Sequence, residues 1–134
     1  MSRILIDTSA YSAFCRGEAS AIEALNACDL IVVNPIVIGE LLAGFKGGKQ
    51  KAKNEKELND FLAAPRVQVI QIDEETSSRY AAVLLSLKQA GTPIPTNDVW
   101  IAASAMQHGL EVFTGDAHFS KVPQIVVKPI STSN

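Results

Sequence analysis

Short apolar runs separated by longer helical segments limit this chain to a small set of folds. Strands are predicted at 3–6, 29–33, 67–72, 111–114 and 125–127. Helices are predicted at 8–16, 19–27, 35–46, 51–63, 74–90 and 97–109. Because successive strands lie too far apart for hairpins, a mainly parallel sheet of about five strands is expected, with helices on both faces. The predicted fold class is therefore α/β.

The length and composition fit one domain spanning residues 1–134. The chain is 47% hydrophobic and 19% charged, and it contains no internal repeat or linker. Its longest apolar stretch is broken by Pro35 and Glu40, which argues against a membrane span. Cys15 and Cys28 form neither a CxxC pair nor a disulfide framework, so they are expected to be reduced thiols. A cytoplasmic protein is expected.

Three aspartates fall where a parallel sheet usually places a functional crevice. Asp7 follows the first predicted strand, Asp116 comes two residues after the fourth, and Asp98 opens a predicted helix. In α/β sheets such crevices lie at the carboxyl ends of the strands. Each aspartate taken alone also fits a helix cap or a turn. Together they predict a carboxylate pocket at one edge of the sheet.

Glu40 is harder to explain as a surface residue. It lies in an apolar helical segment, and the residues three and four positions away are Ile36, Val37, Ala43 and Gly44. None of these is a cation that could pair with it. Burying such a carboxylate alone would cost several kcal/mol or force its protonation, and a metal ion would remove that cost. The alternative is a glutamate at the edge of the apolar stripe.

Four carboxylates in one pocket need a countercharge to remain ionised. The chain offers no cysteine or histidine partner at metal-binding spacing, and oxygen ligands favour Mg²⁺ or Mn²⁺ over Zn²⁺. Such an ion activates water and neutralises a scissile phosphate. Such a metal centre would suit chemistry on a phosphodiester.

The net charge of −2 argues mildly against a nucleic-acid partner. However, five lysines cluster within eleven residues, accompanied by a single acid, Glu55: Lys46, Lys49, Lys51, Lys53 and Lys56. This cluster is interpreted either as a solvated helix face or as a surface that contacts nucleic acid.

Four stretches together resemble the PIN domain, and within it the VapC-type toxins of bacterial and archaeal toxin–antitoxin pairs. They are Ile4-Leu5-Ile6-Asp7-Thr8-Ser9, Ile38-Gly39-Glu40-Leu41-Leu42-Ala43-Gly44, Thr96-Asn97-Asp98 through Ile101-Ala102-Ala103, and Phe113-Thr114-Gly115-Asp116 through His118-Phe119. Their order and spacing agree with the family over nearly the whole chain.

The resemblance implies an endoribonuclease that depends on Mg²⁺ or Mn²⁺ and attacks RNA with a metal-activated water. The expected catalytic and metal-binding residues are Asp7, Glu40, Asp98 and Asp116. Thr8, Thr114 and Asn97 match positions next to these acids. In this family the lysine cluster is more readily interpreted as an RNA-contacting rim, with Lys46, Lys49 and Lys53 as candidates. His118 is interpreted as a capping or surface histidine.

The resemblance also implies partners. VapC-type toxins usually form homodimers and are held inactive by a small antitoxin whose tail lies in a groove near the active site. The apolar side chains of Tyr11, Phe14, Leu42 and Phe45 are candidates for such a groove, although core packing is the simpler interpretation for each.

Two other functions compete with the nuclease. One is a catalytically silent PIN-like module that binds RNA or protein. The other is an aspartate-pocket phosphotransfer domain with Asp7 as the nucleophile. The phosphatase version of that domain needs a second aspartate two residues later, where this chain has Ser9.

Overall fold

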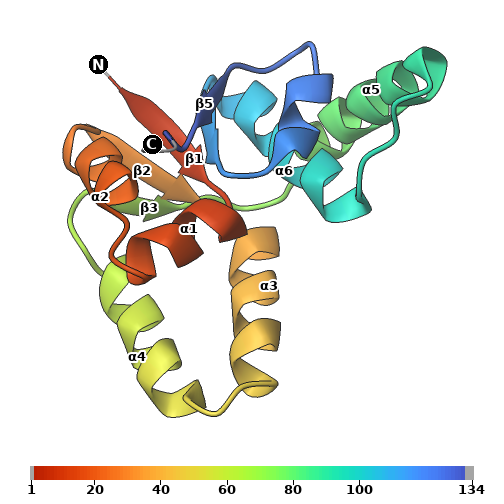
Figure 1. Cartoon of the computed structure of the whole chain (residues 1–134). Coiled ribbons are helices and arrows are strands. Elements are labelled where there is room, and N and C mark those ends of the chain that lie inside the picture. Colours follow the sequence, from red (N-terminus) through yellow and green to blue (C-terminus); the bar gives the residue numbers. More distant parts are fainter. Residues whose placement is uncertain (1, 132–134) are drawn as a thin grey trace.

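A computed structural model describes residues 2–131 of the chain (Figure 1). The strands are β1 (Arg3–Ile6), β2 (Leu30–Val33), β3 (Val67–Val69), β4 (Glu111–Thr114) and β5 (Val127–Pro129). The helices are α1 (Thr8–Cys15), α2 (Ala19–Asn26), α3 (Pro35–Lys46), α4 (Lys51–Leu62), α5 (Glu74–Ala90) and α6 (Thr96–His108). A short 3₁₀ helix, η1 (Ala117–Lys121), follows β4.

All five strands form one parallel sheet in the order β3-β2-β1-β4-β5, which confirms the predicted α/β class. The chain moves outward from β1 through β2 to β3, and then returns to place β4 on the other side of β1. Because parallel crossovers are right-handed, this reversal puts α5 and α6 on the face opposite α1 and α2. The sheet therefore has helices on both faces, and its strand order reverses between β1 and β4.

The two central strands supply the middle of the core. Ile4, Leu5 and Ile6 of β1 are fully buried, as are Val112 and Phe113 of β4. A strand covered on both faces has no solvated side, so its residues are continuously apolar instead of alternating. This explains why the sequence shows short apolar runs at both places.

Two strands differ from their predicted ranges by more than one residue. β3 ends at Val69 instead of residue 72, and β5 covers Val127–Pro129 instead of 125–127. In each case the partner strand decides the length: Val69 pairs with Val33, the last residue of β2, and Val127 pairs with Val112 of β4. Ile125 is apolar because it packs against the core, although it lies outside the paired segment.

Helices α3 and α4 form an arm that extends away from the sheet (Figure 1). Near the sheet, the ring of Phe61 in α4 packs against Tyr11 and Phe14 of α1, with ring centroids 5.1 and 5.8 Å apart. Leu58 is the buried residue of α4. None of the helices within residues 2–131 is both long enough and apolar enough to cross a lipid bilayer.

Candidate active site

The strand order brings the ends of β1 and β4 together, and this junction is where the candidate site lies. Ile6 pairs with Phe113, and the backbone N–H of Asp7 donates to the carbonyl of Phe113 at 3.1 Å. The reversal point of a parallel sheet leaves a crevice at its carboxyl edge because the connections on either side diverge to opposite faces. Asp7 is the first residue after β1, and Thr114 is the last residue of β4, so both lie at that edge.

Asp7 is the most buried of the four predicted acids, with 4% of its surface exposed. It caps α1 by accepting from the backbone N–H of Ala10 at 2.8 Å, and its oxygens also accept from the hydroxyls of Ser9 and Thr114. Burial raises its pKa above the ordinary aspartate value, the three hydrogen bonds oppose that rise, and the charge of Asp116 adds to it. The donors thus orient the carboxylate, but none of them carries a positive charge that would neutralise it.

Two hydroxyl groups connect Asp7 to the loop after β4. Ser9 Oγ donates to Asp7 Oδ1 at 2.8 Å and accepts from the backbone N–H of Gly115 at 2.9 Å. Thr114 Oγ1 accepts from the backbone N–H of Asp116 at 2.8 Å while it donates to Asp7. Ser9 was not among the predicted site residues. Its position two residues after Asp7 was the signal that its hydroxyl could reach back to the carboxylate.

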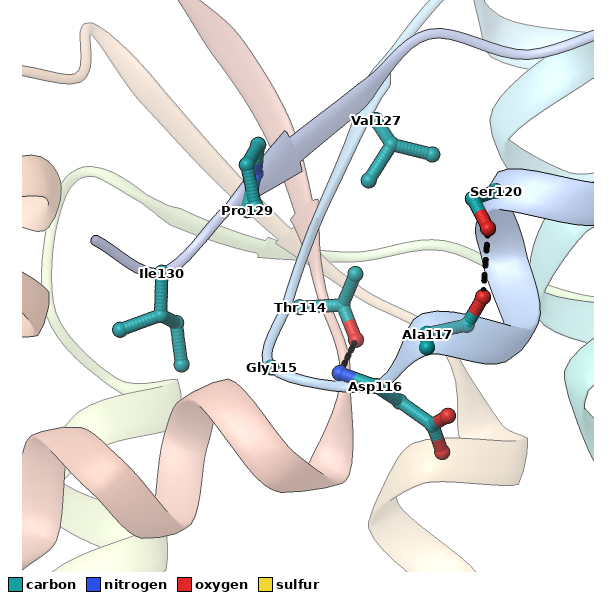
Figure 2. A pocket seen from close by; sticks show the side chains of 8 residues that line it. All are labelled: Thr114, Gly115, Asp116, Ala117, Ser120, Val127, Pro129 and Ile130. Atoms are coloured by element: carbon teal, nitrogen blue, oxygen red, sulfur yellow. Dashed lines mark hydrogen bonds between the residues drawn. The ribbon is translucent and has the colours of Figure 1, made fainter. Parts of the chain in front are cut away.

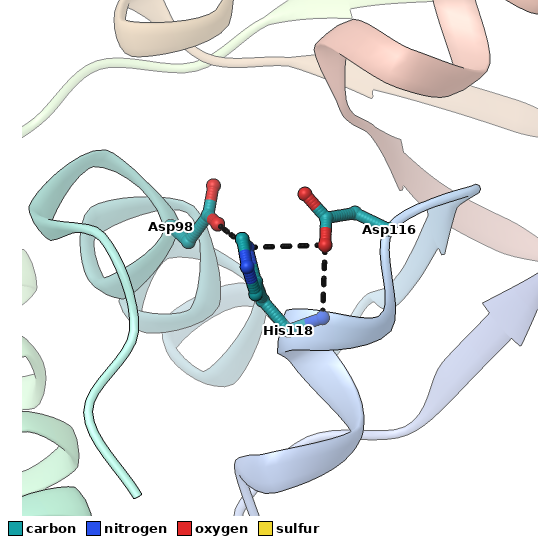
Figure 3. Close-up of side chains that lie close together, drawn as sticks. All are labelled: Asp98, Asp116 and His118. Atoms are coloured by element: carbon teal, nitrogen blue, oxygen red, sulfur yellow. Dashed lines mark hydrogen bonds and ion pairs between the residues drawn. The ribbon is translucent and has the colours of Figure 1, made fainter.

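Asp98 and Asp116 lie on either side of the His118 imidazole (Figure 3). Nδ1 of His118 is 2.9 Å from Asp98 Oδ2 and 3.0 Å from Asp116 Oδ1. The His118 side chain is 41% exposed, so it lies at the surface, but the turn of η1 also folds its ring back between two acids that are distant in sequence. One ligand atom from each of the three residues lies within 4.8 Å of the others.

The electrostatics of Asp98 resemble those of Asp7. Burial is the main cause that raises the pKa of Asp98, and the charges of Asp116 and Glu40 raise it further. The hydrogen bond from His118 lowers it. Both carboxyl groups are therefore harder to ionise than an ordinary aspartate unless a cation joins them.

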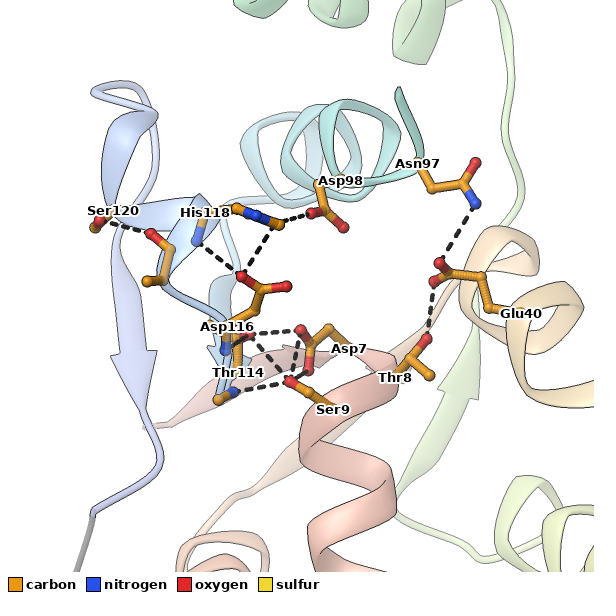
Figure 4. A network of polar contacts seen from close by, with 12 residues as sticks. Asp7, Thr8, Ser9, Glu40, Asn97, Asp98, Thr114, Asp116, His118 and Ser120 are labelled. Atoms are coloured by element: carbon orange, nitrogen blue, oxygen red, sulfur yellow. Dashed lines mark hydrogen bonds and ion pairs between the residues drawn. The ribbon is translucent and has the colours of Figure 1, made fainter. Parts of the chain in front are cut away.

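Glu40 faces the same space from α3 (Figure 4). It is only partly buried, so it is not isolated in the core. Thr8 Oγ1 donates to its Oε1 at 2.8 Å, and Asn97 Nδ2 donates to its Oε2 at 3.3 Å. Both oxygens of Glu40 are held by neutral donors, which orient the carboxylate without neutralising it.

A buried amide ties α3 to α6, the helices that carry Glu40 and Asp98. Asn34 caps α3 by accepting from the backbone N–H of Val37 at 3.0 Å, and its Nδ2 donates to Ser104 Oγ of α6 at 3.1 Å. Asn34 and Ser104 are both fully buried. Asn34 was not among the predicted site residues, because nothing in the local sequence shows which helix its side chain contacts.

The structure brings together seven of the predicted site residues and leaves three apart. Those that share the pocket are Asp7, Thr8, Glu40, Asn97, Asp98, Thr114 and Asp116 (Figure 4). The lysines of the cluster lie instead along the end of α3 and along α4, on the arm. Lys53 is 3.9 Å from Glu57 and Lys56 is 2.9 Å from Asp60, so part of the cluster is paired on its own helix.

A hollow of about 450 Å³ adjoins the loop that carries Asp116 (Figure 2). Its lining is mostly apolar and comes from β4, β5 and η1: Thr114, Gly115, Asp116, Ala117, Ser120, Val127, Pro129 and Ile130. In Figure 2 the Asp116 carboxylate points away from the other lining residues. The hollow therefore lies behind the carboxylate pocket and is not its centre.

The donor set of the pocket suits a divalent cation. Four carboxylates surround one space, and the pKa values of Asp7 and Asp98 are raised by burial and by neighbouring negative charge. Such a group is stable in its ionised form only with an added positive charge, and oxygen donors favour Mg²⁺ or Mn²⁺. A parallel sheet with an acid pocket at its reversal point defines the class: an α/β protein with a cluster of carboxylates at the carboxyl edge of its sheet.

The chain belongs to the PIN-domain family. The family model for the PIN domain matches residues 4–125. The chain is 30% identical to Ribonuclease VapC4 of Mycobacterium tuberculosis over 95 residues, which are 71% of this chain and 73% of that protein. It is 27% identical to Ribonuclease VapC of Rickettsia bellii over 126 residues, covering 92% of this chain and 93% of that protein.

Solved structures share the fold. VapBC2 from Rickettsia felis, bound to a DNA fragment from its promoter, superimposes with a TM-score of 0.86 at 23% identity, covering 96% of this chain and 99% of that chain. Mycobacterium tuberculosis VapC20, described as a toxin that cleaves the sarcin–ricin loop, gives a TM-score of 0.72 at 17% identity, covering 94% and 99%. At these identities the likeness concerns the fold alone.

Proposed function

We propose that this protein is a divalent-metal-dependent endoribonuclease and the toxin of a type II toxin–antitoxin pair. The observation that carries the proposal is the meeting of Asp7, Glu40, Asp98 and Asp116 in one pocket, from four separate segments of the chain (Figure 4). The family membership and the curated relatives named as ribonucleases support RNA as the substrate class.

In this proposal Asp7, Asp98 and Asp116 hold Mg²⁺ or Mn²⁺, and Glu40 is the fourth carboxylate of the pocket. When bound, the ion supplies an acidified water and neutralises charge on the phosphate. Thr8 and Asn97 hold Glu40 so that it can accept a hydrogen bond from the attacking water. Because the nucleophile is water and not the ribose 2′-hydroxyl, the expected products carry a 5′-phosphate and a 3′-hydroxyl.

The test is cleavage of a mixed RNA by antitoxin-free protein in Mg²⁺, Mn²⁺ or EDTA. Asp7→Asn and Glu40→Gln each remove one pocket charge with little change in shape. Glu23→Gln is the matched control, because Glu23 is exposed on α2. Cleavage is expected with either metal for the wild type and the control, and it is expected to be lost in EDTA and in both pocket variants.

Two results would contradict the proposal. Cleavage that persists in EDTA or in Asp7→Asn would place the chemistry elsewhere. Products ending in a 2′,3′-cyclic phosphate would replace water with the ribose hydroxyl as the nucleophile. Binding of RNA without any cleavage by folded protein would instead favour a silent PIN-like binding module.

The lysines on the arm are proposed as an RNA-contacting rim. Lys46 and Lys49 are exposed near the end of α3, and Lys53 is exposed although it lies near Glu57. Changing Lys46 and Lys49 to Glu is expected to weaken RNA binding and to flatten its salt dependence, because fewer counterions are released. Unchanged binding in filter assays at low salt would contradict this role.

The toxin role and its partners are part of the same proposal. Structures of similar fold include a toxin–antitoxin complex from Klebsiella pneumoniae and a member of the VapBC family of toxin–antitoxin systems from Mycobacterium tuberculosis. They support a small antitoxin partner and, with the family, a homodimer. Phe14 of α1 and Leu42 and Phe45 of α3 are partly buried and remain candidates for the antitoxin groove, whereas Tyr11 is buried in the core. Induced expression of the wild type should arrest growth of a bacterial host, and expression of Asp7→Asn should not.

A further inference from the structure

His118 occupies an unusual position for a residue to which the family resemblance assigned no role at the acids. Its Nδ1 is nearly equidistant from Asp98 Oδ2 and Asp116 Oδ1, at 2.9 and 3.0 Å, and its backbone N–H also donates to Asp116 Oδ1 at 2.9 Å. The ring thus bridges helix α6 and the loop after β4, which carry two of the pocket acids.

The partners of Nδ1 determine what this nitrogen can do. Both are carboxylate oxygens, which accept hydrogen bonds, so Nδ1 carries the hydrogen and shares it between them. A protonated nitrogen has no lone pair to give to a metal. Nδ1 therefore holds the two aspartates and is not a third ligand beside them.

The free oxygens of the two aspartates support this description. In Figure 3 the second oxygen of each carboxylate points away from the imidazole, and both point to the same side. Figure 4 shows the imidazole on one side of the pair, with Asp7 and Glu40 on the other. The imidazole therefore contacts one oxygen of each aspartate, the outer oxygen. The other oxygen of each, the inner oxygen, faces Asp7 and Glu40.

We propose that His118 is a positioning residue that holds Asp98 and Asp116 with their inner oxygens ready for a divalent cation. This inference rests on the proposed function, because it requires that the pocket binds such an ion. Without the bridge, the two negatively charged groups would turn apart, and the cation would have to reassemble its ligands as it binds. Groups that orient metal ligands in this way typically contribute about 10- to 100-fold in metal affinity.

The variants follow from the geometry of the ring. The amide nitrogen of asparagine is as many bonds from Cα as Nδ1 of histidine, so His118→Asn keeps a donor at the bridging position. His118→Gln places its donor near the position of Nε2, and His118→Ala removes it. His108→Ala is the control, because His108 is the other of the two histidines and lies at the end of α6.

The measurement is Mn²⁺ binding by calorimetry to antitoxin-free protein, with thermal melting in EDTA to verify folding. His118→Ala and His118→Gln are expected to bind Mn²⁺ about 10- to 100-fold more weakly than wild type. His118→Asn and His108→Ala are expected to bind close to wild type. If His118→Ala does not fold, the comparison between the asparagine and glutamine variants still decides the question.

Three outcomes would overturn the inference, and they are distinguishable. Wild-type affinity in folded His118→Ala or in His118→Gln would show that the bridge is not needed. Affinity in His118→Asn as low as in His118→Gln would show that a donor at this position is insufficient, as expected if the imidazole were itself a ligand. No Mn²⁺ binding by the wild type would overturn the proposed metal-dependent function together with this inference.

Discussion

Replacing Thr114 with valine tests how the pocket keeps a buried acid ionised. Thr114 is 1% exposed, and its hydroxyl donates to Asp7 while it accepts from the backbone N–H of Asp116. Valine has nearly the same shape but can neither donate nor accept a hydrogen bond. Loss of a hydrogen bond to a charged group costs roughly 1.5–3 kcal/mol, and an unpaired N–H that is partly buried adds about 1 kcal/mol. The expected loss in unfolding free energy is thus about 2–4 kcal/mol.

The pH dependence separates this effect from ordinary repacking. The hydrogen bond from Thr114 lowers the pKa of Asp7 and partly offsets the rise caused by burial. Valine should therefore raise that pKa further, so the loss should be largest above the folded pKa, where Asp7 is ionised, and smaller where it is protonated.

Urea unfolding in EDTA, at mildly acidic and mildly alkaline pH, measures both quantities. Thr114→Ser is the matched control, because it keeps the hydroxyl and removes one buried methyl group, at a cost of about 1 kcal/mol. A valine variant no less stable than the serine variant, or a loss independent of pH, would refute the reasoning.

Three further predictions concern the same pocket. In EDTA, the free energy of unfolding should fall as pH rises through the folded pKa values of Asp7 and Asp98, which are raised. The reason is that a raised carboxyl pKa stabilises the folded state only while that carboxyl is protonated. Melting temperatures across a pH series measure this fall. Mg²⁺ should stabilise the protein by about 2.7 kcal/mol at a hundredfold excess over its Kd, and an unchanged melting temperature would count against a metal site. Asn34→Ala should lower the free energy of unfolding in urea by about 2 kcal/mol, because α3 loses its cap and the Ser104 hydroxyl loses its partner. A decrease below about 0.5 kcal/mol would be inconsistent with a stabilising hydrogen bond between Asn34 and Ser104.

The fold was predictable because it depends on patterns that are local in the chain. Continuous apolar runs indicated buried strands, and the spacing between them required parallel pairing. The ends of α5 were also predictable from the sequence, since Asp73 caps the helix and Gly91 follows it with a positive φ of 68°. The lengths of β3 and β5 were not, because the end of a partner strand decides where pairing stops.

The acids of the candidate site were also identifiable from sequence, although their supporting groups were not. Asp7 and Asp116 follow strands, and Glu40 stands in an apolar helix without a nearby cation, so each is conspicuous in its own segment. Ser9 and His118 look like ordinary helix-start and surface residues until their partners are known. Their roles depend on groups that tertiary packing alone supplies.

The alternation of strands and helices, the parallel sheet and the carboxylates at its edge all follow from the order of residues along the chain. The position of β4 beside β1 depends on packing between distant segments, and it places the Thr114 hydroxyl against Asp7 across 107 positions of chain. The tertiary structure likewise placed His118 between Asp98 and Asp116, and Asn34 against Ser104. The physical reason is that local propensity and hydrophobic period act over a few residues, whereas strand order and side-chain bridges arise from packing between distant segments.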